Sequence, residues 1–153
     1  MARGGTGGPV ARRARDGEMP RVLELRFAVF CEEQGVPEAL ERDDADAGAV
    51  HLVVAEGGEV IGTCRLLGAG GGVVRLGRMA VERRRRGEGL GALLLDRAHD
   101  LAREDGAREV ELHAQVAVAG FYARAGYVAE GGHFTEAGIA HVLMRRPLGP
   151  VRR

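Results

Sequence analysis

The feature that most constrains the fold is a glycine-rich loop between a predicted strand and a predicted helix, within residues 73–106. The stretch VVRLGRMAV is typical of a β-strand, and it continues through ERRRRGEGLG into a segment with a different hydrophobic period. From Leu90 to Ala102 the apolar residues fall on one face of a helix, which Gly106 ends. A helix N-terminus leaves backbone N–H groups unpaired and carries partial positive charge, so this junction suits an anion such as a phosphate.

The letters of the loop fit other kinds of site less well. A nucleic-acid surface needs spread basic residues and aromatic side chains, whereas 4% of the residues are aromatic and Glu82 and Glu88 interrupt the arginine run. A P-loop needs a lysine, and the chain has none. The letters GEGLGA match a dinucleotide fingerprint, with Glu109 or Glu111 about 20 residues beyond. However, ERRRR separates the strand from the first glycine, and too little chain follows for a doubly wound sheet.

Composition removes several kinds of chemistry. All 22 basic residues are arginine and 22 acidic residues balance them, so the overall charge favours neither nucleic acid nor a membrane as a partner. The chain has no Ser and no Lys, which excludes a Ser-His-Asp triad and a lysine Schiff base. Neither a membrane-spanning apolar run nor a hydrophobic signal segment is present, so we expect a cytoplasmic protein. Cys31, Cys64 and the histidines lack metal-ligand spacing, which predicts buried reduced thiols and no metal.

The length of 153 residues fits a single domain. Residues 1–15 are rich in Gly and Arg without apolar periodicity, which predicts a mobile tail. Residues 16–148 are expected to form one domain, and 149–153 a C-terminal tail. Asp16 is predicted to cap a first helix that has Pro20 in its first turns and ends at EEQGVP.

The remaining pattern predicts the order of the later elements. An acidic connection, ALERDDADAG, precedes three strands that tight glycine-rich turns join into an antiparallel meander, at residues 51–55, 60–67 and 73–81. After the helix from Leu90, REVELHA predicts a strand, VAVAGFYARAG a short helix, and residues 127–130 and 140–145 the last two strands. The chain is therefore predicted to be a small mixed α/β domain.

The segment RLGRMAVERRRRGEGLGALLL resembles motif A of the GNAT superfamily of N-acetyltransferases. The signature of that motif, [QR]-x-x-G-x-[GA], is matched from Arg86 to Gly91. In FYARAGY, Tyr122 occupies the place of a tyrosine that the family carries late in the chain, and Gln115 falls where many members have asparagine. RFAVFCEEQGVP, AVHLVVA, VIGTCRL, HAQ and EAGIAHVLM extend the resemblance, toward the ElaA/YjcF-like branch, over about residues 20 to 146.

The resemblance implies a fold, an activity and a cofactor. The fold would be a central, mostly antiparallel twisted sheet of six or seven strands with splayed middle strands, flanked by about four helices. The activity would be transfer of an acetyl group from acetyl-coenzyme A to an amine in a ternary complex. The pyrophosphate would lie on backbone N–H groups of the loop and the pantetheine arm along the preceding strand. The residues implied to bind the coenzyme are Met79, Ala80, Val81, Arg86, Gly87, Glu88, Gly89, Leu90, Gly91, Ala92, Gln115 and Tyr122.

The resemblance also implies catalytic roles. The backbone N–H of Val81 would stabilise the oxyanion, and the hydroxyl of Tyr122 would protonate the departing thiolate. An amine must also lose a proton before it attacks. Candidates for that base are Glu111 and three residues that are also candidate substrate contacts: Glu33, His113 and His141. Arg83 to Arg85 are expected to meet a 3′-phosphate or solvent.

Two alternatives remain open at this point. One is a coenzyme A-binding GNAT-like module with a regulatory role and no catalysis. The other is an acyltransferase like the acyl-homoserine-lactone synthases, with approximate matches at Arg26, Phe30, Asp43, Asp46 and Arg65. The acceptor is expected to be a small-molecule or peptide amine, and the protein a monomer or homodimer. The acidic run Glu41, Asp43, Asp44 and Asp46 could attract a cationic amine, although a solvated acidic loop is the more common meaning of such a run.

Overall fold

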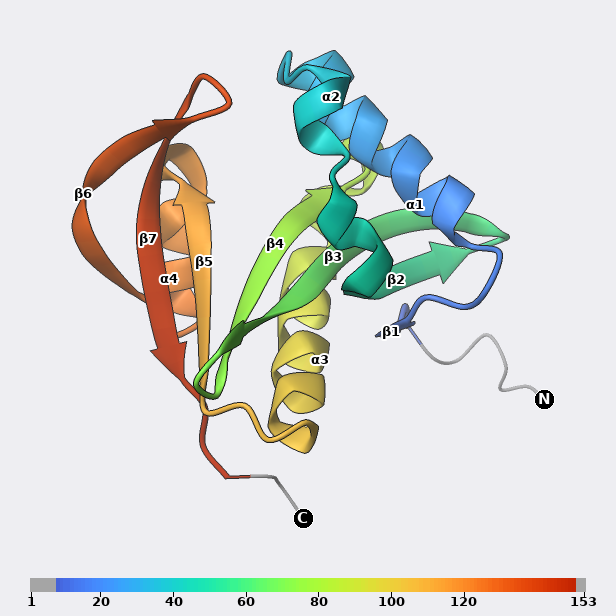
Figure 1. Ribbon diagram of the computed structural model, residues 1–153. Coiled ribbons are helices and arrows are strands. Elements are labelled where there is room, and N and C mark those ends of the chain that lie inside the picture. Colours follow the sequence, from blue (N-terminus) through green and yellow to red (C-terminus); the bar gives the residue numbers. More distant parts are fainter. Residues whose placement is uncertain (1–7, 151–153) are drawn as a thin grey trace.

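Seven strands form one mixed sheet in the order β1-β2-β3-β4-β5-β7-β6, in a computed structural model that describes residues 8–150. Helices cover both faces of this sheet (Figure 1). The seven-stranded mixed α/β architecture confirms the predicted fold class. The strands are β1 (Ala11–Arg13), β2 (Val50–Glu56), β3 (Glu59–Gly70), β4 (Val73–Val81), β5 (Glu109–Gln115), β6 (Val128–Glu136) and β7 (Ile139–Pro147). The helices are α1 (Met19–Arg26), α2 (Glu38–Glu41), α3 (Leu90–Glu104) and α4 (Ala119–Arg124), with shorter or irregular turns at η2 (Phe27–Glu33), η3 (Asp44–Gly48), η4 (Arg83–Arg85) and η5 (Val116–Val118).

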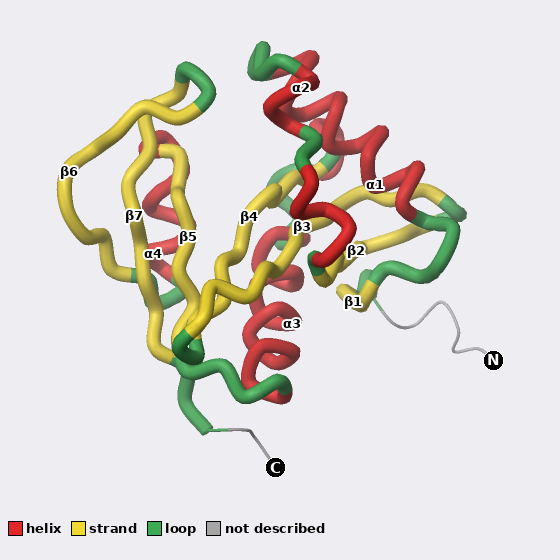
Figure 2. Tube along the Cα trace, in the orientation of Figure 1, coloured by secondary structure: helices red, strands yellow, loops and turns green. Residues whose placement is uncertain are grey.

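The sheet separates between β4 and β5, as the resemblance implies. These two strands are parallel and pair only from Val73 to Arg75 on β4 and from Glu109 to Glu111 on β5. Beyond that point they diverge, so that β4 and β5 form a V in the Cα trace (Figure 2). The register of β4 against β3 also shifts between Ala80 and Gly77. Arg78, within that shift, has a φ of 50°, which marks a β-bulge that bends the strand.

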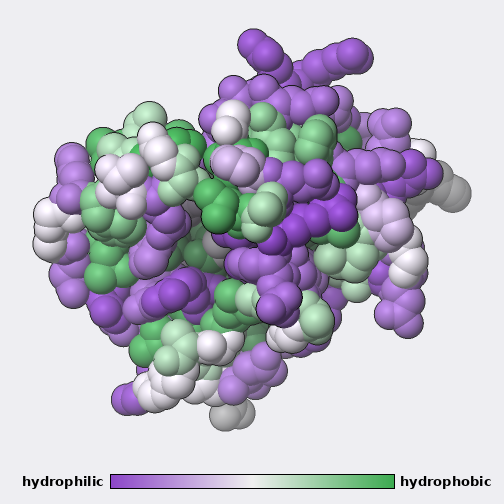
Figure 3. All heavy atoms as spheres, turned by 45° about the horizontal axis from the view of Figure 1, so that its top comes forward, coloured by the Kyte–Doolittle hydropathy of each residue, from purple (hydrophilic) through white to green (hydrophobic). Residues whose placement is uncertain are grey.

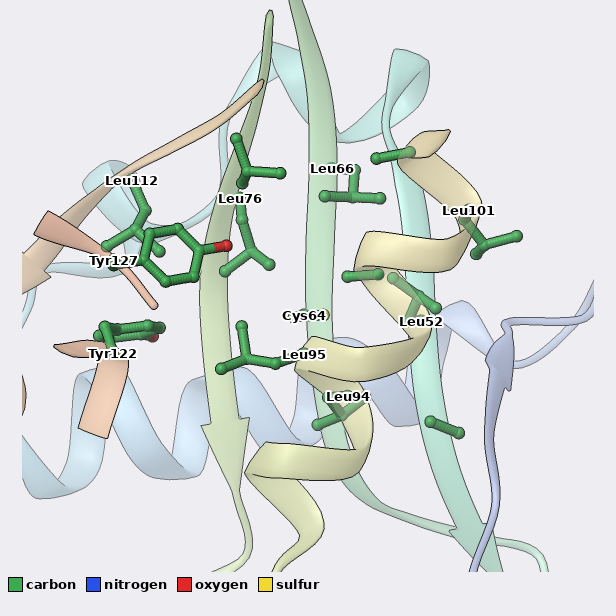
Figure 4. Packing of buried hydrophobic residues seen from close by; sticks show 14 of the residues in the cluster. Leu52, Cys64, Leu66, Leu76, Leu94, Leu95, Leu101, Leu112, Tyr122 and Tyr127 are labelled. Carbon is green, nitrogen blue, oxygen red and sulfur yellow. The ribbon is translucent and has the colours of Figure 1, made fainter. Parts of the chain in front are cut away.

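Alternate residues of the strands pack against helices on opposite faces, as the side-chain period of a strand requires. On one face Leu52 and Val54 join the larger core with Leu94 of α3 and Tyr122 of α4, part of which Figure 4 shows. On the other face Val53 packs with residues of α1 and η2. The two helical layers therefore fix both sides of the strands that carry the site.

The N-terminal predictions need correction. Residues 1–7 of the predicted tail lie outside the described residues, but Ala11 to Arg13 form an edge strand that pairs with β2. Asp16 does not cap the first helix. Glu18 occupies the N-cap position, and its carboxylate accepts hydrogen bonds from the backbone N–H of Arg15 at 2.6 Å and from the Arg12 guanidinium at 2.8 Å. These contacts, the Arg12 bond first, lower the pKa of Glu18 to about 2.

The structure also lengthens or reshapes several predicted elements. The first helix is α-helical only to Arg26 and continues as a π-helix through Glu33. The acidic connection folds into α2 and η3 rather than remaining a loop. The last two strands extend to 128–136 and 139–147, because they pair as a long hairpin. No helix between residues 8 and 150 is both long and apolar enough to cross a membrane.

Candidate functional site

A cleft of about 940 Å³ opens where β4 and β5 diverge. In Figure 3 the surface is hollowed between the part formed by β5 to β7 and the part formed by α1 and α2, with hydrophilic and hydrophobic residues along its border. Most residues that the sequence singles out line it: 79–81, 86–92 apart from Glu88, and His113, Gln115, Tyr122 and His141. The strand, the glycine loop and the late tyrosine thus meet in one place.

The glycine loop leads directly into the N-terminus of α3. Gly87 and Gly89 have φ values of 84° and 82°, in the left-handed region that favours glycine. Gly89 is the N-cap residue, and no side chain caps the helix there. The first N–H groups of α3 therefore lack intrahelical partners, and they face a cleft that the same loop lines. A Cβ on Gly89 would meet no atom within 4 Å, so the space in front of the helix is open.

The arginines of the loop divide between two tasks. Arg85 holds the loop in place, because its guanidinium pairs with Glu56 at 2.6 Å and with Glu88 at 3.0 Å. Arg85 therefore has partners besides solvent and also lines the cleft, whereas Glu88 is turned toward it and does not line the cleft. Arg86 lines the cleft as well. Its Nε donates to the carbonyl of Val81 at 3.1 Å, and its two terminal nitrogens pair with Glu33 at 2.9 and 3.1 Å.

The backbone N–H of Val81 points away from β3. Val81 lies opposite Gly62, and the next residue, Glu82, donates its N–H to the carbonyl of Ile61 at 2.9 Å. Hydrogen-bonded and non-hydrogen-bonded pairs alternate in an antiparallel ladder, so Val81 and Gly62 form a non-hydrogen-bonded pair. The N–H of Val81 consequently faces the side on which β5 has diverged. The end of β4 thus presents a free donor to the cleft.

Tyr122 reaches the cleft from α4. The residue is 7% exposed, and its ring stands edge to face with Phe121 and Tyr127, at centroid distances of 5.0 and 5.8 Å. Figure 4 labels both tyrosines and Leu112, which belong to the same core cluster. The Tyr127 hydroxyl hydrogen-bonds to His99 Nε2 at 2.7 Å, whereas Tyr122 lines the cleft. Burial raises the pKa of Tyr122 above its usual value, so this hydroxyl stays protonated and can donate.

Two contacts connect the end of the first helix to the far side of the cleft. Gln34 accepts a hydrogen bond from Gln115 Nε2 at 2.9 Å, and Glu33 holds Arg86. The predicted coenzyme residues Gln115 and Arg86 therefore both have partners from η2 and the residue after it. No local signal in the sequence links these pairs, because they are 81 and 53 residues apart.

The four candidate bases occupy different environments. Glu111 is 7% exposed and bonds to Arg75 and Arg145, and Glu33 is bound to Arg86. Neither carboxylate lines the cleft. His113 and His141 both line it. Glu136, which the sequence did not indicate, lies beside both histidines.

The acidic connection is an ion-pair network and not a solvated loop. Arg26 is fully buried, and its guanidinium bonds to Glu41 at 2.6 Å and to Asp46 at 2.8 Å. Arg65 pairs with Asp43 and Asp46, both at 2.7 Å. These pairs lower the pKa of Asp46 against the effect of its burial. Most residues that suggested a lactone-synthase relative thus connect η3 to α1 and β3, and Glu41, Asp43 and Arg65 also border the cleft.

The two cysteines do not supply a nucleophile. Cys64 is 1% exposed, and burial raises its pKa to about 12, so it remains a thiol. Cys31 is half-buried, which makes the prediction of burial wrong for it. Its pKa is also raised, chiefly by desolvation. Among residues 8–150 no group of His, Cys, Asp and Glu is arranged to hold a metal ion.

Comparison with known proteins agrees with this geometry. Residues 15–148 match the acetyltransferase (GNAT) domain family. YjcF of Bacillus subtilis, named as an uncharacterized N-acetyltransferase, is 32% identical over 123 residues, which cover 80% of this chain and 87% of that protein. The crystal structure of an acyl-CoA N-acyltransferase from Pseudomonas aeruginosa is 30% identical, with a TM-score of 0.80, and covers 92% of this chain and 99% of that chain. Escherichia coli ElaA is 24% identical, with a TM-score of 0.81 over 91% of this chain and 99% of its own, and shows the same fold.

Proposed function

Because the chain belongs to the GNAT superfamily of N-acetyltransferases, we propose that it transfers the acetyl group of acetyl-coenzyme A to a primary amine of a small molecule or peptide. The observation that carries this proposal is the alignment of three features in one cleft. They are the free N–H of Val81, the uncapped N-terminus of α3 at Gly89, and the buried hydroxyl of Tyr122. The first is a hydrogen-bond donor for the thioester oxygen, the second a site for the pyrophosphate, and the third a proton donor for the sulfur.

The residues of the loop fit the pyrophosphate of coenzyme A. The N–H groups from Gly87 to Ala92 surround the start of α3, where the helix dipole favours negative charge. The Arg86 guanidinium adds a positive charge at the edge of the same space. Open space in front of Gly89 lets a phosphate approach the backbone. When bound, the coenzyme supplies the acyl group as an activated thioester.

The protein's own groups then act at the reacting atoms. The Val81 N–H donates a hydrogen bond to the oxygen on which negative charge develops during attack. The Tyr122 hydroxyl donates its proton to the sulfur as the carbon–sulfur bond breaks. Both donors are fixed before the reaction, one by the β3–β4 ladder and the other by packing against Phe121 and Tyr127.

Titration calorimetry with coenzyme A and acetyl-coenzyme A tests the proposal. A Gly89→Val variant is expected to bind at least about tenfold more weakly, because a branched side chain strains this positive-φ position and fills the space before the helix. Gly106→Val is the matched control, since Gly106 has a φ of 88° at the other end of α3 and does not line the cleft.

The wild type should also release free thiol from acetyl-coenzyme A when a panel of primary amines is supplied. Equal coenzyme affinity in Gly89→Val and the wild type would refute the assigned pyrophosphate site. Tight coenzyme binding without thiol release across the panel would instead favour a regulatory coenzyme-binding module.

A further inference from the structure

Three neighbouring strands bring a second group of polar side chains to the wall of the cleft. In the sheet register Gln115 of β5 lies opposite His141 of β7, and His141 lies opposite Phe134 of β6. Directly paired residues point to the same face of a sheet. His113, two residues before Gln115, therefore shares that face, and Glu136 reaches it from the end of β6. His113, Glu136 and His141 all line the cleft.

The hydrogen bonds determine which nitrogen of each ring carries a proton. His113 Nδ1 lies 2.9 Å from the Glu136 carboxylate. An ionised carboxylate only accepts hydrogen bonds, so Nδ1 is the protonated nitrogen and Nε2 carries the free lone pair. Phe134 packs edge to face against the His113 ring at a centroid distance of 5.1 Å, which fixes its plane. The carboxylate and the Phe134 ring thus hold the imidazole in one orientation, and in its neutral form they favour the Nδ1–H tautomer, the arrangement in which histidine serves as a base.

The neighbouring candidates are less available. His141 Nδ1 donates to the carbonyl of Ile139 at 2.7 Å, and its side chain is 9% exposed, against 30% for His113. The Glu111 carboxylate is already paired with Arg75 and Arg145. His113 thus combines a free nitrogen, a fixed orientation and access to solvent in the cleft.

We propose that His113, positioned by Glu136, is the general base of the transfer reaction, an assignment that rests on the proposed acetyltransferase function. An acceptor enters as an ammonium ion with three protons on nitrogen. One proton passes to His113 Nε2 and then to solvent, after which the nitrogen attacks the thioester carbon. The carbon–nitrogen bond forms and the carbon–sulfur bond breaks. Of the other two protons, one remains on the amide nitrogen and one replaces the proton that Tyr122 gives to sulfur.

Two small nucleophiles separate a base from a structural residue without knowledge of the natural acceptor. Water must lose a proton to attack a thioester, so its reaction depends on a base. Hydroxylamine is already neutral near neutral pH, so its attack depends mainly on the oxyanion donor and on the acid. Acetyl-coenzyme A is incubated with enzyme and either water alone or hydroxylamine, and thiol release is corrected for the reaction without enzyme.

His113→Gln is expected to lower enzyme-dependent hydrolysis by about 100-fold or more, the usual contribution of general-base catalysis, while hydroxylamine transfer and coenzyme affinity stay within about twofold. His133→Gln is the matched control, because His133 is an exposed residue of β6 outside the cleft lining. Glu136→Ala should lower hydrolysis in the same direction. It should also shift His113 from the Nδ1–H toward the Nε2–H tautomer, which nitrogen-15 NMR of the imidazole detects.

The results that would overturn the assignment are distinct from those that would overturn the function. Three results would each exclude His113 as the base. The first is unchanged hydrolysis in His113→Gln, and the second is an equal loss of both reactions in that variant with coenzyme affinity intact. The third is a wild type that uses hydroxylamine but never water. A wild type that binds acetyl-coenzyme A but releases thiol with neither nucleophile would contradict the proposed transferase function itself, and the base assignment with it.

Discussion

Replacing Glu33 with glutamine is expected to tighten the binding of coenzyme A. In the structure the Glu33 carboxylate pairs with both terminal nitrogens of Arg86, at 2.9 and 3.1 Å. Arg86 belongs to the loop assigned to the pyrophosphate, so a phosphate oxygen competes with Glu33 for the same guanidinium. Removing the carboxylate leaves Arg86 free before the coenzyme arrives and removes one negative charge near an anionic ligand.

The size of the effect follows from the exposure of the pair. The two side chains are 43% and 23% exposed, and ion pairs of this kind contribute about 0.2 to 1 kcal/mol. Because 1.4 kcal/mol corresponds to a factor of ten, breaking the pair in advance should lower the dissociation constant by a factor of about 1.4 to 5. The gain should shrink as salt is added, since exposed charges are screened.

Titration calorimetry at low and high salt measures this change. Glu32→Gln is the matched control, because it removes the same charge from an exposed neighbouring position that has no contact with Arg86 among the described residues. Weaker binding in Glu33→Gln would refute the reasoning, since it would mean that Glu33 orients Arg86 for the phosphate instead of competing with it. Equal gains in coenzyme affinity in both variants would mean that the effect comes only from the lost negative charge, and not from the release of Arg86.

Three further predictions concern stability. Glu41→Gln should lower the free energy of unfolding in urea by about 3–5 kcal/mol, because it removes the negative charge beside the buried Arg26 guanidinium. Glu24→Gln, in an exposed pair, should lower it by under about 0.5 kcal/mol, and similar losses in the two variants would contradict the buried ion-pair network. Ala137→Asn should raise the free energy of unfolding by about 1 kcal/mol, because Ala137 has a φ of 51° in a hairpin turn that favours Asn-Gly. A lower urea midpoint for this variant than for the wild type would refute the prediction. Burial lowers the pKa of His99 from 6.5 to about 4. The free energy of unfolding should therefore be highest above pH 6.5 and fall by about 3 kcal/mol toward pH 4, because the unfolded chain binds the proton more tightly. Unfolding of His99→Gln, measured across the same pH range, should lack this loss.

The parts of the fold that the sequence predicts depend on contacts close in the chain. The β4 strand, the glycine loop and α3 follow one another directly, and each has its own period or turn signal. The helix was expected from Leu90 to about Gly106 and extends from Leu90 to Glu104. The residues of the predicted coenzyme site lie mostly within this one segment, which explains why a single motif could indicate them.

The parts that were missed depend on pairs distant in the sequence. Arg26 bonds to Asp46, 20 residues away, and a run of acidic residues looks the same whether it is solvated or held by buried arginines. The pairing of His113 with Glu136 spans 23 residues and depends on the register of three strands. Ala11 to Arg13 form a strand only because the edge of β2 is available to them. Neither hydrophobic periodicity nor local propensity records such partners.

An amide-resolved NMR titration with coenzyme A tests the central claim most directly, because it reports on each backbone N–H of the loop separately. The assigned site predicts that the largest shift changes occur at the N–H groups from Gly87 to Ala92 and at Val81, and that they saturate together with the calorimetric binding curve. Saturable binding that leaves these amides unmoved, with the largest changes outside the cleft between β4 and β5, would contradict the account.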